Sequence, residues 1–109
     1  MRTYAIACLF FLLTSSTFGQ SKGPEKGFVP DAQTAVQIAE AVLIPVYGKT
    51  KIESERPFAA KLENNVWTVS GTLHCSDGKG GTTTTCDGGT AVVKLAKSDA
   101  RILSMMHYK

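Results

Sequence analysis

The sequence has few of the residues from which catalytic and metal sites are usually built. Its 109 residues include only two histidines, three cysteines and one tryptophan. His74 and His107 are each interpreted as a packed or solvent-facing side chain, and no cysteine is expected to be free to act as a nucleophile. We therefore predict a protein that is not an enzyme and that holds no metal or cofactor.

Carboxylates suited to acid–base chemistry are not evident either. Glu53 and Glu55 precede Arg56-Pro57 and are interpreted as the solvated entry to a strand, and Asp99 falls in a turn where it can bond backbone N–H groups. The sequence places no two titratable groups in an apolar setting that would separate their pKa values. This pattern argues further against catalysis.

The charge of the chain is too weak to indicate a nucleic-acid partner. There are 12 basic and 9 acidic residues, and the excess falls to +2 when Arg2 is removed with the leader described below. These charges are scattered and form no basic stripe. Beyond the leader, no apolar run approaches the roughly 20 residues of a membrane helix. We expect no nucleic-acid partner and no membrane span in the mature chain.

The amino terminus has the three parts of a secretory signal peptide. Arg2 is followed by an apolar run over residues 5–13 and by small residues over 14–19, so cleavage is expected between Gly19 and Gln20. Cys8 would be discarded with this leader. The alternative, a lipoprotein cysteine, is disfavoured because most of the apolar run follows it. We predict a signal peptide (1–19), a flexible lead-in (20–27) and one domain (28–109), exported to the bacterial periplasm or cell envelope, or secreted.

Residues 28–48 predict one amphipathic helix. Asp31 can cap its first turn, Pro45 should kink or end it near Ile44, and Gly48 supplies a stop. The apolar residues recur at helical spacing and predict a buried stripe, formed by Ala35, Ile38, Ala39, Val42, Leu43 and Val46.

In the rest of the chain, apolar and polar residues alternate with the period of two that is typical of strands. Strands are predicted at 58–62, 66–73, 90–96 and 101–107. Asn64-Asn65 tolerates positive φ and predicts a tight hairpin turn. The expected fold class is α+β, with one N-terminal helix packed on a four-stranded antiparallel sheet. The exposed fourth strand leaves pairing with a second copy open.

Two cysteines bracket a loop rich in glycine and threonine. In an exported protein, Cys75 and Cys86 most simply form a disulfide, which would stabilise the fold by roughly 3 kcal/mol. A zinc site that also uses His74 and either Asp77 or Asp87 is an alternative, although the spacing matches no finger or ribbon. Two free thiols are the third possibility.

The glycines at the centre of this loop predict a mobile hairpin tip. The segment 78–82 contains Gly-Lys, but a phosphate-binding loop would need four residues between its first glycine and that pair, and a helix afterwards. Exposed loops on a rigid sheet often carry recognition. The candidate partner-binding residues are Asp77, Lys79, Thr83, Asp87 and His107.

Several short motifs occur together in a distinctive order. Phe-Val-Pro-Asp at 28–31 opens the helix, Trp-Thr-Val-Ser-Gly-Thr-Leu occupies 67–73, Lys-Ser-Asp-Ala-Arg-Ile-Leu occupies 97–103, and the chain closes with His107-Tyr108-Lys109. This series resembles the NTF2-fold immunity proteins, small bacterial proteins thought to neutralise toxins. The resemblance implies a cognate protein toxin as partner, bound and blocked by occlusion.

The chain departs from that family pattern in two places. Ala100 stands where the family usually has glycine, so the turn either avoids positive φ or tolerates alanine at roughly 1 kcal/mol. The cysteine-bracketed loop replaces a link that is usually short in the family; if that edge contacts a toxin, the partner of this member would differ from the partners of others. Within the motifs, Phe58, Trp67, Ile102 and Leu103 are expected in the core.

Other functions remain open on the same layout. An exported inhibitor or sensor module of the PepSY or cystatin kind also packs one helix on an antiparallel meander. A small-ligand-binding NTF2-like domain would show a sizeable apolar pocket with a few convergent polar groups.

Overall fold

The first helix begins and ends at residues that the sequence marks. The computed structural model describes residues 24–76, 78–84 and 88–109. Helix α1 runs over Ala32–Tyr47. Asp31 caps it, because its Oδ1 accepts a hydrogen bond of 2.7 Å from the Thr34 N–H, and this bond holds the pKa of the Asp31 carboxyl below its usual value.

Pro45 does not end α1 near Ile44, one of the two outcomes expected of it, and the predicted stop at Gly48 is confirmed. The helix continues to Tyr47, and the Gly48 N–H closes it by donating to the Ile44 carbonyl at 2.8 Å. A proline this close to the end removes one hydrogen bond without preventing the next ones. The predicted stripe is confirmed for Ala35, Ala39 and Leu43, which are buried, and for the partly buried Ile38 and Val42, whereas Val46 is 61% exposed.

A second helix, which the sequence does not predict, follows at once. Helix α2 covers Lys49–Ser54 and is separated from α1 by Gly48 alone, at φ 95°. Six residues with a single buried apolar side chain, Ile52, are too few to reveal a helical period. The interpretation of residues 53–55 as a solvated strand entry is therefore wrong. Neither helix in the described residues has the length and hydropathy of a membrane span.

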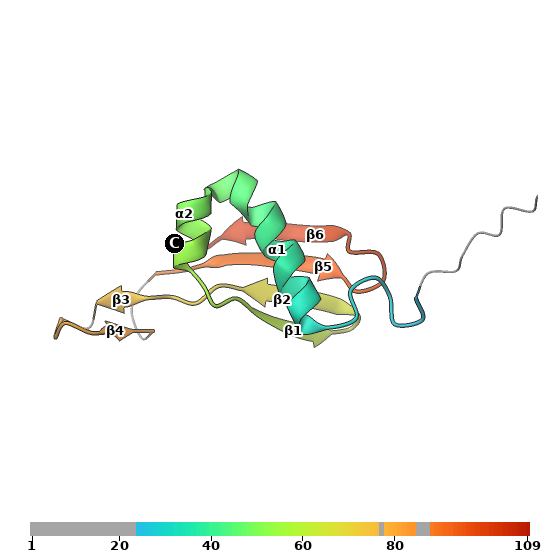
Figure 1. Cartoon of the computed structure of the whole chain (residues 1–109), viewed down its shortest axis with the longest axis horizontal. Helices are drawn as coiled ribbons and strands as arrows, with labels where there is room; N and C mark the ends of the chain where they lie inside the picture. Colours follow the sequence, from blue (N-terminus) through green and yellow to red (C-terminus); the bar gives the residue numbers. More distant parts are fainter. Residues whose placement is uncertain (1–23, 77, 85–87) are drawn as a thin grey trace, which may run out of the picture.

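Four antiparallel strands form the main sheet in the order β1-β2-β5-β6. They are β1 (Ala59–Glu63), β2 (Val66–Ser70), β5 (Ala91–Ala96) and β6 (Ile102–His107). Figure 1 shows both helices on one face of this sheet, which confirms the predicted α+β class. Asn64 and Asn65 both have positive φ, 50° and 61°, in the β1–β2 turn. Ala100 does adopt the left-handed region, at φ 63°.

A small separate hairpin interrupts the meander between β2 and β5. Its strands are β3 (Cys75–Ser76) and β4 (Thr82–Thr83), paired antiparallel with Cys75 opposite Thr83. Figure 1 shows this hairpin projecting beyond the end of the main sheet that α2 covers. Of the cysteine-bracketed segment, Asp77, Cys86 and Asp87 lie outside the described residues.

The core lies between the helices and the inner face of β2 and β5. It contains the predicted Phe58 and Trp67, both buried, but not Ile102 and Leu103, which are 37% and 44% exposed. That part of the prediction is wrong because β6 is an edge strand and its pairing with β5 shifts register between Lys94 and Leu95. The buried members are Val29, Ala35, Ala39, Leu43, Ile52, Phe58, Trp67, Val69, Ala91, Val93 and Leu95.

The segment before α1 is tied to the far turn of the sheet. Phe28 and Val29 donate backbone hydrogen bonds to the carbonyls of Ser98 and Lys97, at 3.0 and 3.1 Å. The indole Nε1 of Trp67 donates to the Val29 carbonyl at 2.9 Å inside the core. Residues 24–27, the described part of the predicted lead-in, turn back on themselves through a bond from the Gly27 N–H to the Pro24 carbonyl.

Candidate functional site

The hairpin that projects from the sheet carries the described members of the predicted recognition loop. Lys79 is exposed near its tip, and Thr83 is half-buried on β4, opposite Cys75. Because Cys86 lies outside the described residues, its pairing with Cys75 stays a prediction, as do the roles of Asp77 and Asp87. The cleavage position at Gly19 and Gln20 also falls outside them.

The fifth predicted contact residue, His107, lies on β6, and there it meets a buried carboxylate. Its Nε2 donates to Glu55 Oε2 at 3.2 Å, and the side chains of His107 and Glu55 are 17% and 10% exposed. Glu55 Oε1 accepts a second hydrogen bond, of 2.7 Å, from the Ala91 N–H. The Tyr47 ring packs on the imidazole with centroids 5.5 Å apart. Sequence reasoning missed this pair, because its members are 52 residues apart and no local pattern connects them.

Motif glycine Gly71 makes room for the buried carboxylate. A Cβ at this position would come within 2.9 Å of Glu55 Cβ and 3.1 Å of Phe58 Cε1. The next residue, Thr72, donates its N–H to the Glu55 carbonyl at 2.7 Å. The glycine of the Trp-Thr-Val-Ser-Gly-Thr-Leu motif therefore allows the end of α2 to lie directly against β2.

Glu55 and His107 line a small polar depression at the base of the hairpin, of about 180 Å³. His74, one residue before β3, lies on its wall and donates from Nε2 to the Arg56 carbonyl at 2.7 Å. Thr72 lies beside it and donates Oγ1–H to the Pro57 carbonyl at 2.6 Å. The full lining is Lys51, Ser54, Glu55, Thr72, Leu73, His74, Gly89 and His107.

The hydrogen bonds around this depression join separate elements of the fold. Glu55, Thr72, His74 and His107 each already bond within the chain, so the network links α2, the start of the hairpin and β6. The described residues contain no group of three His, Cys, Asp or Glu side chains placed to hold a metal ion. The hydrogen-bond network places His107 at the same end of the sheet as the hairpin.

Next to this network, the exposed Arg56 is fixed by a carboxylate on α1. Its Nε donates to Glu40 Oε1 at 2.7 Å, and Glu53 lies 4.0 Å from its Nη1. The bond to Glu40 raises the pKa of the Arg56 guanidinium above its ordinary value. The ion pair ties the segment after α2 back onto α1.

The face of the sheet opposite the helices is open. Trp67 and Val69 point toward the helices, so Thr68 and Ser70, which alternate with them on β2, lie on the open face. A shallow hollow there is lined by Ala59, Ala60, Lys61, Glu63, Thr68, Ser70 and Lys94. Near the hairpin end the same alternation brings Val92 opposite Met106, which is 42% exposed. The open face is thus polar over β1 and β2 and more apolar over β5 and β6.

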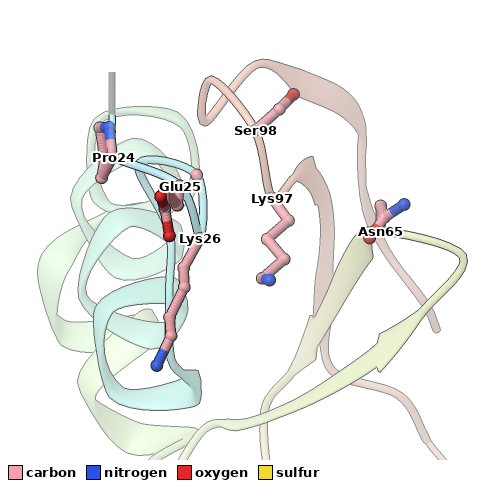
Figure 2. A pocket seen from close by; sticks show the side chains of 7 residues that line it. Pro24, Glu25, Lys26, Asn65, Lys97 and Ser98 are labelled. Atoms are coloured by element: carbon pink, nitrogen blue, oxygen red, sulfur yellow. The ribbon is translucent and has the colours of Figure 1, made fainter. Parts of the chain in front are cut away.

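A second open depression lies at the other end of the sheet. Figure 2 shows it between the segment before α1 and the turn after β5, with Lys26 and Lys97 reaching along its two sides. Gly27 lies at φ 80°, and a Cβ there would come within 2.5 Å of the Lys97 carbonyl oxygen. The close approach that fixes the lead-in creates this depression, so we assign it a structural role.

Comparison with known proteins identifies a family and a curated relative. A family model described as NTF2 fold immunity protein matches residues 34–109. The uncharacterized protein YhhH of Escherichia coli (strain K12) is 27% identical over 90 residues, which cover 83% of this chain. The chain spans 65% of the length of that curated relative. No solved structure matches the chain.

Proposed function

The chain belongs to the NTF2 fold immunity protein family, and from this premise we propose that it neutralises a cognate protein toxin by binding and occluding it. Membership confirms the resemblance in the motifs and supports a toxin-immunity role in general. The match from residue 34 to residue 109 is the observation that carries the proposal, because it covers nearly all of α1, the whole of α2 and every strand of the described residues. Occlusion needs a surface and no chemistry, in keeping with the internally bonded side chains around Glu55.

The open face and the hairpin offer such a surface. A standard interface buries about 800 Å² on each partner. The face of the four strands opposite the helices has no covering helix among the described residues, and the β3–β4 hairpin extends beyond one end of the sheet (Figure 1). Lys79 and Thr83 on the hairpin are the described residues that we assign to the contact.

The proposal also includes the cellular compartment in which the toxin is bound. The segment 1–19 has the charge, apolar run and small-residue exit of a signal peptide, so we propose that the domain acts after export, in the periplasm or cell envelope. A toxin that arrives from a neighbouring cell would meet it there.

Co-expression tests the proposal directly. Cells that express the toxin encoded beside this gene should survive when the full chain is present, and the purified proteins should form a complex. Lys79→Glu on the hairpin should weaken that complex, whereas Lys26→Glu at the opposite end of the sheet should not. If the chain does not protect the cells and the purified proteins do not form a complex, the proposed function is wrong.

A further inference from the structure

The two edges of the main sheet differ in how they are protected. Strand β1 carries Lys61 and Glu63, whose charged groups lie 3.6 Å apart. Charged side chains on an edge discourage pairing with another chain. The opposite edge strand, β6, has no acidic or basic residue between Arg101 and Lys109 except His107, which is held by Glu55. Of these two edges, β1 alone has the usual protection.

The backbone of β6 presents unpaired groups to the outside. The Tyr108 N–H donates to the Thr90 carbonyl at 3.1 Å, so the backbone N–H of Tyr108 points toward the β5 side of the strand. In an antiparallel pair the bonding side alternates along the strand, so the N–H and C=O groups of Met105 and His107 point away from β5. No strand of the described part of the chain pairs with this outer edge.

Apolar side chains accompany these backbone groups. Ile102, Leu103 and Met106 are 37%, 44% and 42% exposed, and Tyr108 is 54% exposed. They follow one another along one strand and its extension as a row whose side chains lie on both faces of the sheet beside the exposed backbone edge. A long apolar edge is a template for another strand. The bond from His107 to Glu55 and the bond from Tyr108 to Thr90 hold the carboxy-terminal half of this template in place.

The charges around the row indicate the chemistry of the strand that fits it. Arg101 precedes the row of apolar residues and Lys109 follows it. The exposed Lys94, on β5, lies opposite Ser104 of β6. Asp99 is the acidic residue nearby, and its Oδ2 lies 3.9 Å from Arg101 Nη1 with both side chains about half exposed or more. The surroundings are therefore cationic on balance. A second copy would bring the same cations to the contact, whereas an acidic partner would complement them.

We propose that β6 receives an extended segment of the cognate toxin as a fifth strand of the sheet, with apolar side chains in the segment and acidic residues at its ends. This inference rests on the proposed function and adds the mode and chemistry of recognition. The strand would lie beside the open face, so backbone pairing at β6 and side-chain contacts across the face would act on the same partner.

The two edges supply a matched pair of variants. Met106→Glu places an acidic charge on the β6 edge, and Leu62→Glu places the same charge on the β1 edge; the two side chains are similarly exposed, at 42% and 40%. The full chain and each variant would be mixed with the toxin encoded beside the gene. Affinity would be measured by calorimetry at low and high salt, backbone protection by hydrogen exchange, and oligomeric state by sedimentation. Circular dichroism melting checks that the variants fold.

The expected result is a loss of affinity of at least about tenfold for the β6 variant, with the β1 variant close to wild type. The amides of Met105 and His107 should gain protection in the complex, and affinity should fall as salt rises. If wild type binds the toxin but the β6 variant binds equally well, the edge proposal is overturned while the proposed function stands. A wild-type dimer that the β6 variant dissociates would identify a second copy as the occupant and also overturn it. Failure of wild type to bind would overturn both.

Discussion

Replacing Glu55 with alanine should destabilise the fold more than any other single loss of a carboxylate in the described residues. Glu55 accepts from the Ala91 N–H at 2.7 Å and from His107 Nε2 at 3.2 Å. Glu55→Ala leaves both of these donors, the Ala91 N–H and the His107 imidazole, without their acceptor.

The magnitude follows from the burial of the two side chains. Those of Glu55 and His107 are only 10% and 17% exposed, so screening by water is weak. Removing one member of a buried pair costs about 3–5 kcal/mol, and a stranded buried donor alone costs about 1–3 kcal/mol. Because His107 retains some contact with water, we expect the lower value, about 3 kcal/mol. For a domain of this size, that loss lowers Tm by about 12–24 °C.

Urea and thermal unfolding followed by circular dichroism measure this loss. Glu53→Ala is the control: it lies on α2, its side chain is 39% exposed, and its contacts with Lys49 and Arg56 are 3.8 and 4.0 Å long. We expect its cost to stay within about 0.5 kcal/mol. Glu55→Gln should fall between the two, since the amide oxygen can still accept from Ala91. A cost for Glu55→Ala no larger than that for Glu53→Ala would refute the role given to this pair.

Three further predictions concern other parts of the chain. Gly71→Ala should cost about 1–3 kcal/mol, because its Cβ would lie 2.9 Å from Glu55 Cβ; an unchanged urea midpoint would contradict the packing described. Asp31→Ala should lower the urea midpoint at neutral pH. Because the folded-state pKa of Asp31 is depressed, its stabilisation is present above the unfolded value of 3.8 and is lost as pH falls, so the wild-type and variant midpoints should converge in acid; a constant difference would contradict this. Peptide mapping without reductant should recover Cys75 joined to Cys86, and reduction should cost roughly 3 kcal/mol; Cys75 joined to another thiol would show the pairing to be wrong.

Local signals in the sequence predict the structure correctly where one or two residues determine it. The Asp31 cap, the positive φ of Asn64 and Asn65 and the alternation of β2 and β5 each depend on neighbours in the chain. The family motifs add the order of the elements. The first helix, the four strands of the main sheet and their antiparallel arrangement could therefore be predicted from the sequence alone.

The candidate site is harder to predict because its contacts join distant residues. The neighbours of Glu55 in the sequence suggest a solvated side chain. Its hydrogen-bond partners are Ala91, 36 residues away, and His107, 52 residues away, so no local pattern reveals that its carboxylate is buried and bonded. The apolar residues at 102 and 103 predict core positions. The alternation of residues along a strand does not show that the strand lies at the edge of the sheet, where such side chains stay exposed. The exposed hairpin that carries Lys79 is predicted correctly, whereas nothing near His107 in the sequence predicts its buried carboxylate partner.

The bond between Trp67 and Val29 has a consequence for the order of events during synthesis. Val29 is held by the Lys97 carbonyl as well as by the indole, and Lys97 lies 68 positions later in the chain. A chain that emerges amino end first from a ribosome has no partner for the Val29 N–H until the turn after β5 appears. Until then the Trp67 indole can hold the Val29 carbonyl, but the backbone bonds from Phe28 and Val29 to the turn after β5 cannot form. These two backbone bonds therefore depend on a turn that is synthesised near the end of the chain.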